Sequence, residues 1–188
     1  MQHAIAISFA GRAGHDRAAV YEVGDERVIA LADGAGNSSA ASRAAEIFVA
    51  ACGHTDVDWD ALDEQLIRLG GQCTAVVVRI SKAGIRGASV GDSVVWLVRD
   101  REVVELTENQ IRKPLLGDGA MLTMFTSDRL DGATLLVASD GLWRYAKREA
   151  IVDALGGDNL ATTATSLVEL VRLPNGELQD DVAVVIVR

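Results

Sequence analysis

Several aspartates occupy positions in the sequence that suit chemistry. Each stands where a short apolar segment ends or begins, and most have a glycine next to them. A carboxylate at a strand end is held by the sheet yet faces a loop, and glycine lets the backbone or a ligand approach closely. Converging carboxylates repel one another unless a cation lies between them, and Mg²⁺ and Mn²⁺ prefer such oxygen ligands. The aspartates are Asp33 after VIALA, Asp92 after ASVG, Asp140 after LLVAS, and Asp180 with Asp181 before VAVVIV.

Asp-Gly pairs are also common turn signals, and this alternative stays open for each pair taken alone. Asp118 lies between two glycines and Asp131 precedes Gly132, but neither follows an apolar segment, so plain turns are expected at both places. The recurrence of the strand-end position favours a cation site at the other aspartates without deciding it.

The elements that must position these aspartates follow from residue periodicity. Short β-branched segments divided by glycine-containing turns predict strands, and apolar residues at helical spacing after a capping residue predict helices. Strands are expected at 4–9, 18–23, 28–32, 74–80, 85–90, 94–99, 103–106, 134–139 and 182–187, with the run from 74 to 106 as an antiparallel meander. Helices are expected at 38–52, 58–69, 147–155 and 158–172, and residues 108–127 form the least regular stretch.

This order of elements predicts the α+β class, because the strands cluster apart from the helix pairs and do not alternate with them. The length of 188 residues and the 49% hydrophobic content are typical of a single domain, expected to span residues 1–188. Trp59, Trp96 and Trp143 are expected in or near the core, and Cys73 as a buried thiol. The acidic cluster from Asp56 to Glu64 is expected at a helix N-terminus, not in a calcium site.

The charge balance argues against some partners. The formal net charge is −9 and no basic block is present, so neither nucleic acid nor an anionic membrane is expected as a partner. The N-terminus lacks a signal peptide's features. Cys52 and Cys73 lack the spacing of a metal site or disulfide framework, which favours a reducing compartment. A cytoplasmic location is therefore expected.

Short motifs follow one another in a characteristic order. GDS followed by SDGLW, with ADG upstream, is far more specific than any of these motifs alone. In this order the chain resembles, nearly end to end, the metal-dependent serine/threonine protein phosphatases of the type 2C (PPM) family, especially short bacterial members. The motifs are ADGAG at 32–36, GQCTA at 71–75, VGDS at 90–93, LTE at 106–108, SDGLW at 139–143 and DDVA at 180–183.

The resemblance implies a fold and a reaction. The fold is a four-layer αββα sandwich, in which two central antiparallel sheets are flanked by helix pairs. Residues 108–127 are too few for a full flap subdomain, so a minimal version is expected. The reaction is hydrolysis of phosphoserine and phosphothreonine in proteins by a hydroxide bridging two divalent cations, Mn²⁺ or Mg²⁺. A phosphoprotein substrate, and a Ser/Thr kinase or its targets, would be the partners.

The resemblance also implies roles for individual residues. Asp33 would bridge both cations with help from the Gly34 carbonyl, and Asp140 and Asp180 would hold the first cation. Which of Asp180 and Asp181 binds stays open. Asp16 would bind waters around the metals, and Asp92 with Asp140 would hold a third, weaker cation. Asp33 and Asp140 are thereby the principal catalytic residues.

The chain departs from the family pattern at several positions. The usual Asn-(Glu/Gln)-Asp motif reads Gly14-His15-Asp16, so His15 is either a proton donor to the leaving oxygen or an ordinary solvated or core histidine. Arg12, or alternatively Arg17, stands near the usual phosphate-binding arginine, and either could be a plain surface charge. Asn109-Gln110 replaces the Asp-His that follows Leu-Thr.

Two other functions remain as alternatives. The departures are compatible with a weak or inactive phosphatase fold that serves as a regulatory or binding module. The loop from Gly34 to Gly36, between a strand and a helix, also resembles part of a dinucleotide-binding motif. Ser39 replaces the third glycine of that motif, and no strand-end acid follows at the required distance, which disfavours it.

Overall fold

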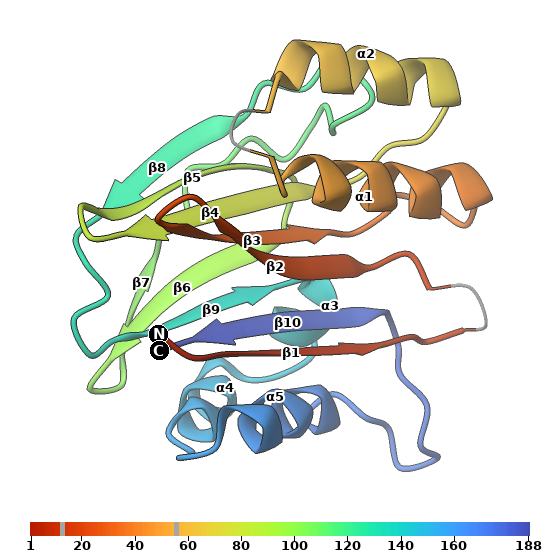
Figure 1. Cartoon of the computed structure of the whole chain (residues 1–188). Coiled ribbons are helices and arrows are strands. Elements are labelled where there is room, and N and C mark those ends of the chain that lie inside the picture. The colour runs from red at the N-terminus through yellow and green to blue at the C-terminus, as the bar shows by residue number, and fades with distance from the viewer. Residues whose placement is uncertain (12–13, 55–56) are drawn as a thin grey trace.

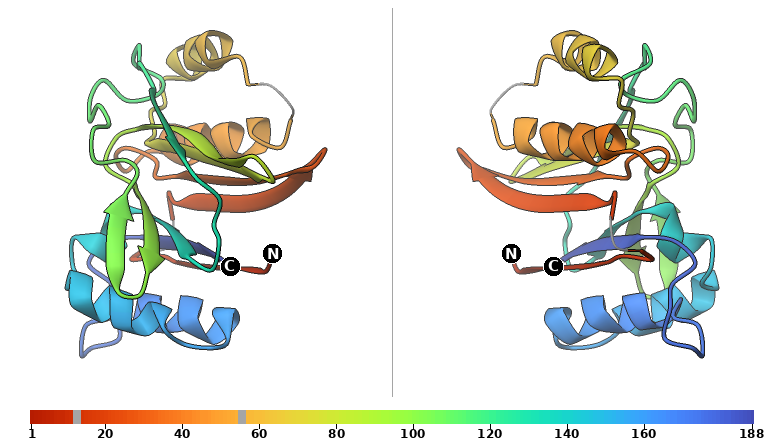
Figure 2. Two further views of the ribbon diagram at one scale, coloured as in Figure 1. Left: turned by 90° about the vertical axis from the view of Figure 1, so that its left-hand side faces the viewer. Right: turned by 90° about the vertical axis from the view of Figure 1, so that its right-hand side faces the viewer.

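Two antiparallel sheets lie face to face, and helices cover the outer face of each (Figure 1; Figure 2). A computed structural model describes residues 1–11, 14–54 and 57–188. The first sheet has the order β1 (His3–Ser8), β10 (Val182–Val187), β9 (Thr134–Ala138), β6 (Val94–Arg99), β7 (Glu102–Glu105). The second has the order β2 (Arg17–Val23), β3 (Glu26–Ala32), β4 (Ala75–Ser81), β5 (Gly84–Val90), β8 (Thr123–Ser127).

The helices form the two outer layers, as Figure 2 shows edge-on. α1 (Ser39–Ala51) and α2 (Trp59–Leu69) cover the second sheet, and α4 (Arg148–Leu155) and α5 (Leu160–Glu169) cover the first. A short helix, α3 (Asp140–Trp143), follows β9 directly. The α+β, four-layer αββα sandwich with two central antiparallel sheets is thereby confirmed.

Local sequence signals account for the helix boundaries. The Ser38 hydroxyl accepts a hydrogen bond from the Ala41 amide and begins α1. The Asp58 carboxylate accepts one from Ala61 at 3.0 Å and begins α2, which ends at Gly70 with φ of 72°. These are the caps expected for polar residues before a helix and for glycine after it. Asp58 therefore caps a helix as predicted, while Asp56 lies outside the described residues.

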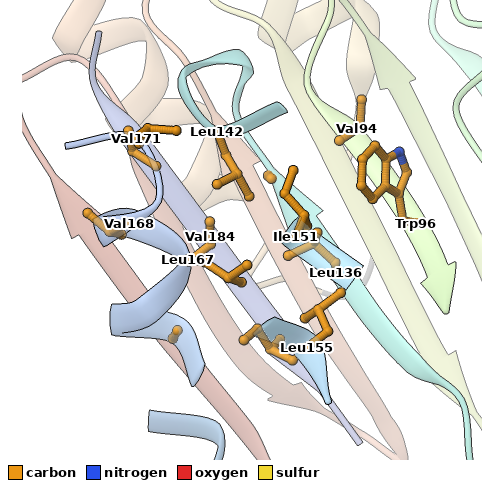
Figure 3. Close-up of a cluster of buried hydrophobic side chains, with 14 of the residues drawn as sticks. Val94, Trp96, Leu136, Leu142, Ile151, Leu155, Leu167, Val168, Val171 and Val184 are labelled. Carbon is orange, nitrogen blue, oxygen red and sulfur yellow. The ribbon is translucent and has the colours of Figure 1, made fainter. Parts of the chain in front are cut away.

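The core consists of one layer between the sheets and one under each helix pair. The position of β10 inside the sandwich explains why its sequence is continuously apolar. Val185 packs between the sheets, whereas Val184 and Ile186 face the helices. A strand covered on both faces has no polar side to present. Figure 3 shows the outer cluster of the first sheet, where Val184 and Leu136 meet side chains from the helices, including Leu142, Ile151, Leu155 and Leu167.

The expected meander from residue 74 to 106 is wrong in its pairing. β4 and β5 pair in the second sheet, whereas β6 and β7 pair in the first. The chain crosses between the sheets at Gly91-Asp92. Gly91 has φ of 107°, and a Cβ there would lie 2.7 Å from Thr74 Cγ2, so the crossing requires glycine. Asp92 consequently stands between the two sheets and not in a hairpin within one of them.

Other boundaries also differ from the sequence prediction. β8 is a partly exposed edge strand paired with β5, and its side chains lack the apolar run of a covered strand. α3 is a single turn too short to show helical periodicity. α5 is capped by Asn159, whose side chain accepts from the Thr162 amide, and not by Asp158. It ends at Glu169, earlier than expected.

The segment between β7 and β8 is short and irregular. Residues 106–122 are all described, and they contain no helix and no strand beyond the isolated bridge of Leu116 with Cys73. The Asp63 carboxylate on α2 accepts hydrogen bonds from the amides of Gly117 and Gly119 at 2.6 and 3.0 Å. This segment is therefore tied down onto α2, in agreement with the expected lack of a full flap subdomain. Across the described residues, no helix has the length and apolar character needed to cross a membrane.

Gly141 offers a test of how tightly α3 packs on the start of β10. A Cβ there would lie 1.9 Å from the Asp181 carbonyl oxygen, whereas a Cβ at Gly11 would meet no described residue within 4 Å. We expect Gly141→Ala to lower the free energy of unfolding by about 1–3 kcal/mol, because the backbone must shift. Gly11→Ala is the matched control in urea unfolding. Equal stability of the two variants would contradict this packing.

Candidate active site

Aspartates from both sheets meet at one edge of the sandwich. Asp16 immediately precedes β2 and Asp33 immediately follows β3, and these strands pair with Arg17 opposite Ala32. The two aspartates are therefore neighbours at one end of the second sheet. This is the right-hand edge in Figure 1, where β1 ends and β10 begins.

The first sheet contributes its aspartates at the same edge. Asp140 comes two residues after β9 ends, and Asp180 comes two residues before β10 begins. β9 and β10 are antiparallel, with Ala138 opposite Val184, so the end of one lies beside the beginning of the other. The strand-end positions recognised in the sequence are thus brought together by sheet pairing.

A hydrogen bond between the sheets fixes Asp16. Ser139 Oγ donates to Asp16 Oδ2 at 2.6 Å and accepts from the Ala183 amide at 2.9 Å. Asp16 is fully buried, and among the described residues no donor reaches its other oxygen, Oδ1. A buried carboxylate oxygen without a donor is costly unless the group is protonated or a cation is near.

Asp180 and Asp181 have different surroundings. Both oxygens of Asp181 accept backbone hydrogen bonds, Oδ1 from Ala10 at 2.8 Å and Oδ2 from His15 at 2.6 Å. The Asp181 carboxylate therefore ties the end of β1 and the approach to β2 to the start of β10. Within the described part of the chain, the Asp180 side chain accepts a hydrogen bond from the Asp181 amide alone, at 3.0 Å, and it is less buried. Asp180 is accordingly the freer of the two carboxylates.

Polar side chains within the sheets hold Asp33 in place. The Asp33 amide donates to Thr74 Oγ1 at 2.9 Å, and the Thr74 amide donates to the Asp33 carbonyl at 2.8 Å. Thr74 Oγ1 also shares a hydrogen bond with Ser93 Oγ at 3.0 Å. The sequence reasoning gave Thr74, Ser93 and Ser139 no role. Each of the three is a serine or threonine that lies next to an apolar strand within one of the motifs, and this position in the sequence could have identified them.

Arg144 contacts two of the candidate carboxylates, and the sequence reasoning missed it as well. Its Nη1 lies 2.8 Å from Asp140 Oδ2, and its Nη2 lies 3.1 Å from Asp92 Oδ2. The Trp143 indole donates to the Asp92 carbonyl at 2.9 Å. Asp92 is thus held from α3 through both its backbone and its side chain.

Burial and mutual repulsion raise the pKa values of these aspartates. Burial is the largest cause for each, and it raises the pKa of Asp16 to about 9, that of Asp33 to about 7 and that of Asp140 to about 6. Neighbouring carboxylates add to this: Asp33 acts on Asp16, Asp140 acts on Asp33, and Asp92 acts on Asp140. Each aspartate is therefore close enough to its neighbours for their charges to oppose its ionisation.

Some of these carboxylates open onto a cleft of about 370 Å³, whereas Asp16, Asp92 and Asp140 are not among its lining residues. Asp33, Asp180 and Asp181 line it together with His15 and the loop from Gly34 to Asn37. A Cβ on Gly34 would lie 2.6 Å from the Ala41 carbonyl oxygen, so only glycine allows this loop to pack under α1. The cleft is consequently polar, acidic and formed in part by backbone.

The donor set suits a hard divalent cation, although the side chains are not gathered around one point. In the described part of the chain, no three Asp, Glu, His or Cys side chains lie close enough to hold one ion as they stand. Asp92 and Asp140 are turned to Arg144 instead. Asp16 has an oxygen that no described donor reaches, and the pKa values of Asp33 and Asp140 are raised. Both observations are expected of buried carboxylates with too little positive charge around them.

The remaining candidates are only partly associated with the cleft. His15 lines it, with Nδ1 3.9 Å from Asp181 Oδ2. Arg17 is engaged elsewhere, donating to the carbonyls of Gly14 and Asp16 and pairing with Glu46 at 2.9 Å. Arg12 lies outside the described residues.

Residues outside the cleft serve packing. Gln110 donates to the Ser93 carbonyl at 2.8 Å and supports the GDS loop, while Asn109 is exposed. Cys73 is buried, which raises the pKa of its thiol, as expected for an unreactive core cysteine. Trp59, Trp96 and Trp143 pack in or against the hydrophobic clusters, as predicted.

The raised pKa values predict a pH dependence of stability in chelator. The native state keeps protons that unfolded aspartates, with pKa near 3.8, have already lost. Stability must therefore fall as the pH rises toward the native pKa of about 9 for Asp16. Asp16→Asn removes that group, so we expect it to lessen the fall between about pH 5 and about pH 8 by on the order of 1 kcal/mol per pH unit.

Urea unfolding in EDTA at the two pH values measures this dependence. Asp118→Asn, at an exposed aspartate, is the matched control and should follow the wild type. A wild-type stability that is constant or rises over this range would contradict the raised pKa values.

The chain is similar in sequence to a known phosphatase. No family model matches the chain. The chain is 26% identical to the serine/threonine protein phosphatase PstP of Mycobacterium tuberculosis (strain H37Rv), over 85% of this chain and 40% of PstP. The chain therefore spans about two fifths of the length of this curated relative.

Solved structures share the fold over almost the whole chain. A serine/threonine phosphatase from S. agalactiae aligns with a TM-score of 0.85 at 20% identity, covering 98% of both chains. The catalytic domain of PstP in complex with two manganese ions aligns with a TM-score of 0.79 at 22% identity, covering 98% of this chain and 96% of that one. PppA of Pseudomonas aeruginosa aligns with a TM-score of 0.82 at 15% identity, covering 98% and 96%. The chain is thus similar in sequence to a serine/threonine protein phosphatase, and it shares its fold with solved bacterial serine/threonine phosphatases.

Proposed function

We propose that the chain is a metal-dependent phosphatase that hydrolyses phosphoserine and phosphothreonine in proteins. The observation that carries the proposal is the gathering of Asp33, Asp140 and Asp180 from three strand ends of two sheets onto one acidic edge. Burying and crowding carboxylates in this way costs stability unless cations offset the charge. The curated relative is a serine/threonine protein phosphatase, and its catalytic domain has been solved with two manganese ions.

Specific residues of this chain would hold the cations, Mn²⁺ or Mg²⁺. Asp33 would hold both with help from the Gly34 carbonyl, Asp140 and Asp180 would hold the first, and Asp16 would bind the waters around the metals. When bound, such ions lower the pKa of water and offset charge on phosphoryl oxygens. The chain's part is to hold these oxygens rigidly, through the hydrogen bonds of Asp33 with Thr74 and of Asp16 with Ser139.

Asp180 is the better candidate ligand than Asp181. Both oxygens of Asp181 already accept from backbone amides, and if they turned to a cation the amides of Ala10 and His15 would lose these acceptors. Asp180 lines the cleft and accepts one hydrogen bond from the residues that the structure describes. We therefore propose Asp180 as a ligand of the cation and Asp181 as a structural residue that holds the amides of Ala10 and His15.

His15 is the candidate for donating a proton to the leaving oxygen. It lines the cleft, and its backbone amide is fixed by Asp181. Histidine is suited to this role near neutral pH. The engagement of Arg17 with backbone carbonyls and Glu46 leaves Arg12 as the candidate phosphate-binding arginine. A phosphoprotein, and with it a Ser/Thr kinase or that kinase's targets, would be the partner.

A second candidate function is a regulatory or binding module with the phosphatase fold. The observation in its favour is that Asp92 and Asp140 are paired with Arg144, with no three ligand side chains gathered for one ion in the described residues. A dinucleotide-binding site is disfavoured, because a pyrophosphate near the Gly34–Gly36 loop would face the carboxylates of Asp33 and Asp180.

Hydrolysis of a phosphothreonine peptide tests the proposed function. We expect activity with Mn²⁺ that EDTA abolishes. Asp33→Asn and Asp180→Asn should each lower kcat/KM by at least about 100-fold, because removing a ligand costs at least as much as removing a residue that orients one. The matched control, Asp118→Asn, changes an exposed aspartate and should keep wild-type activity.

The second candidate function makes the opposite prediction. A folded wild-type chain that binds no Mn²⁺ at millimolar concentrations in calorimetry and hydrolyses no phosphopeptide would favour the regulatory module. Activity that survives EDTA and both substitutions would refute a metal-dependent reaction.

A further inference from the structure

Arg144 lies across two of the candidate metal-binding carboxylates, Asp92 and Asp140. Its guanidinium binds Asp140 Oδ2 through Nη1 at 2.8 Å and Asp92 Oδ2 through Nη2 at 3.1 Å. The Asp140 side chain is 9% exposed and the Asp92 side chain 27%, so both ion pairs are sheltered on the carboxylate side. These are charge-assisted contacts from one planar group to two acids.

Contacts within α3 and between α3 and the crossing at Asp92 hold Arg144 against the two aspartates. α3 begins at Asp140, and the Arg144 amide donates to the Asp140 carbonyl at 3.0 Å, so the helical turn sets Arg144 one turn after its partner. The Trp143 indole donates to the Asp92 carbonyl at 2.9 Å and holds the crossing between the sheets against α3. The Arg144 guanidinium also lies 5.7 Å from the centre of the Trp143 ring.

The charge of Arg144 is permanent. A guanidinium keeps its proton at every pH at which the protein is folded, so it supplies one positive charge between Asp92 and Asp140. These are the two residues that the family resemblance assigns to a third, weaker cation. A guanidinium and a divalent cation cannot both occupy the space between the same two carboxylate oxygens.

We propose that Arg144 is a built-in cation that replaces the third metal ion at Asp92. In this chain Asp92 then binds arginine, and the cleft takes one divalent ion fewer than a variant without the charge at position 144. The proposal rests on the proposed function for the main cations. What it predicts by itself is a difference in the number of bound divalent ions between the wild type and a variant without the charge at position 144.

The number of Mn²⁺ ions bound per chain tests the proposal without reference to activity. Equilibrium dialysis against millimolar Mn²⁺, with metal analysis, should give one more ion for Arg144→Gln than for the wild type. Arg144→Lys keeps a positive charge and should bind the wild-type number. Arg68→Gln, which removes an exposed arginine paired with Glu64, is the control and should also match wild type.

Asp92 supplies an independent arm should Arg144→Gln fold poorly by circular dichroism. Asp92→Asn in the wild-type background should leave the number of ions unchanged, because Asp92 is occupied by arginine. In the Arg144→Gln background the same substitution should remove the extra ion. Loss of one ion from Asp92→Asn alone would show that Asp92 binds metal in the wild type and would overturn the proposal.

The outcomes separate this proposal from the proposed function. Equal ion numbers in the wild type and folded Arg144→Gln would overturn the role of Arg144 while leaving the phosphatase proposal intact. A wild type that binds no Mn²⁺ would overturn the phosphatase proposal. In that case a gain of one ion in Arg144→Gln would still support the role of Arg144, and no gain would overturn both.

Discussion

Mutual repulsion among buried carboxylates is the constraint on which the rest of this structure depends. Burial and neighbouring acids together raise the pKa values of Asp16, Asp33 and Asp140. Groups that repel in this way stay together only if a rigid frame holds their backbones. Three apolar layers provide that frame, and the Asp181 carboxylate and the Ser139 hydroxyl tie the two sheets together at the acidic edge.

The sequence was sufficient for the fold class and for most strand ends, because both depend on local periodicity. The position of an aspartate after an apolar segment is visible in the chain itself. Which strands pair is not, and this is why the predicted meander was wrong. β5 and β6 are close in sequence but belong to different sheets, and that partition depends on tertiary packing around Gly91. β8 and α3 are too short or too exposed to show a period.

The parts of the site that escaped prediction depend on three-dimensional contacts. Adjacent aspartates at 180 and 181 look alike in sequence, yet only Asp181 has both oxygens on amides from segments more than a hundred residues away. Arg144 follows a recognised motif, but its pairing with Asp92 requires the crossing between the sheets. The same frame that crowds the acids therefore also supplies their partial neutralisation, through one arginine and a set of backbone amides.

A crystal structure of the chain with Mn²⁺, using anomalous scattering to locate the metal, tests the central claim most directly. The account predicts two anomalous peaks at the acidic edge, contacted by Asp33, Asp140 and Asp180, with Asp181 still on the amides of Ala10 and His15 and Arg144 still on Asp92. Absence of any peak there at millimolar Mn²⁺ would contradict the account. So would a metal held by Asp181 in place of Asp180.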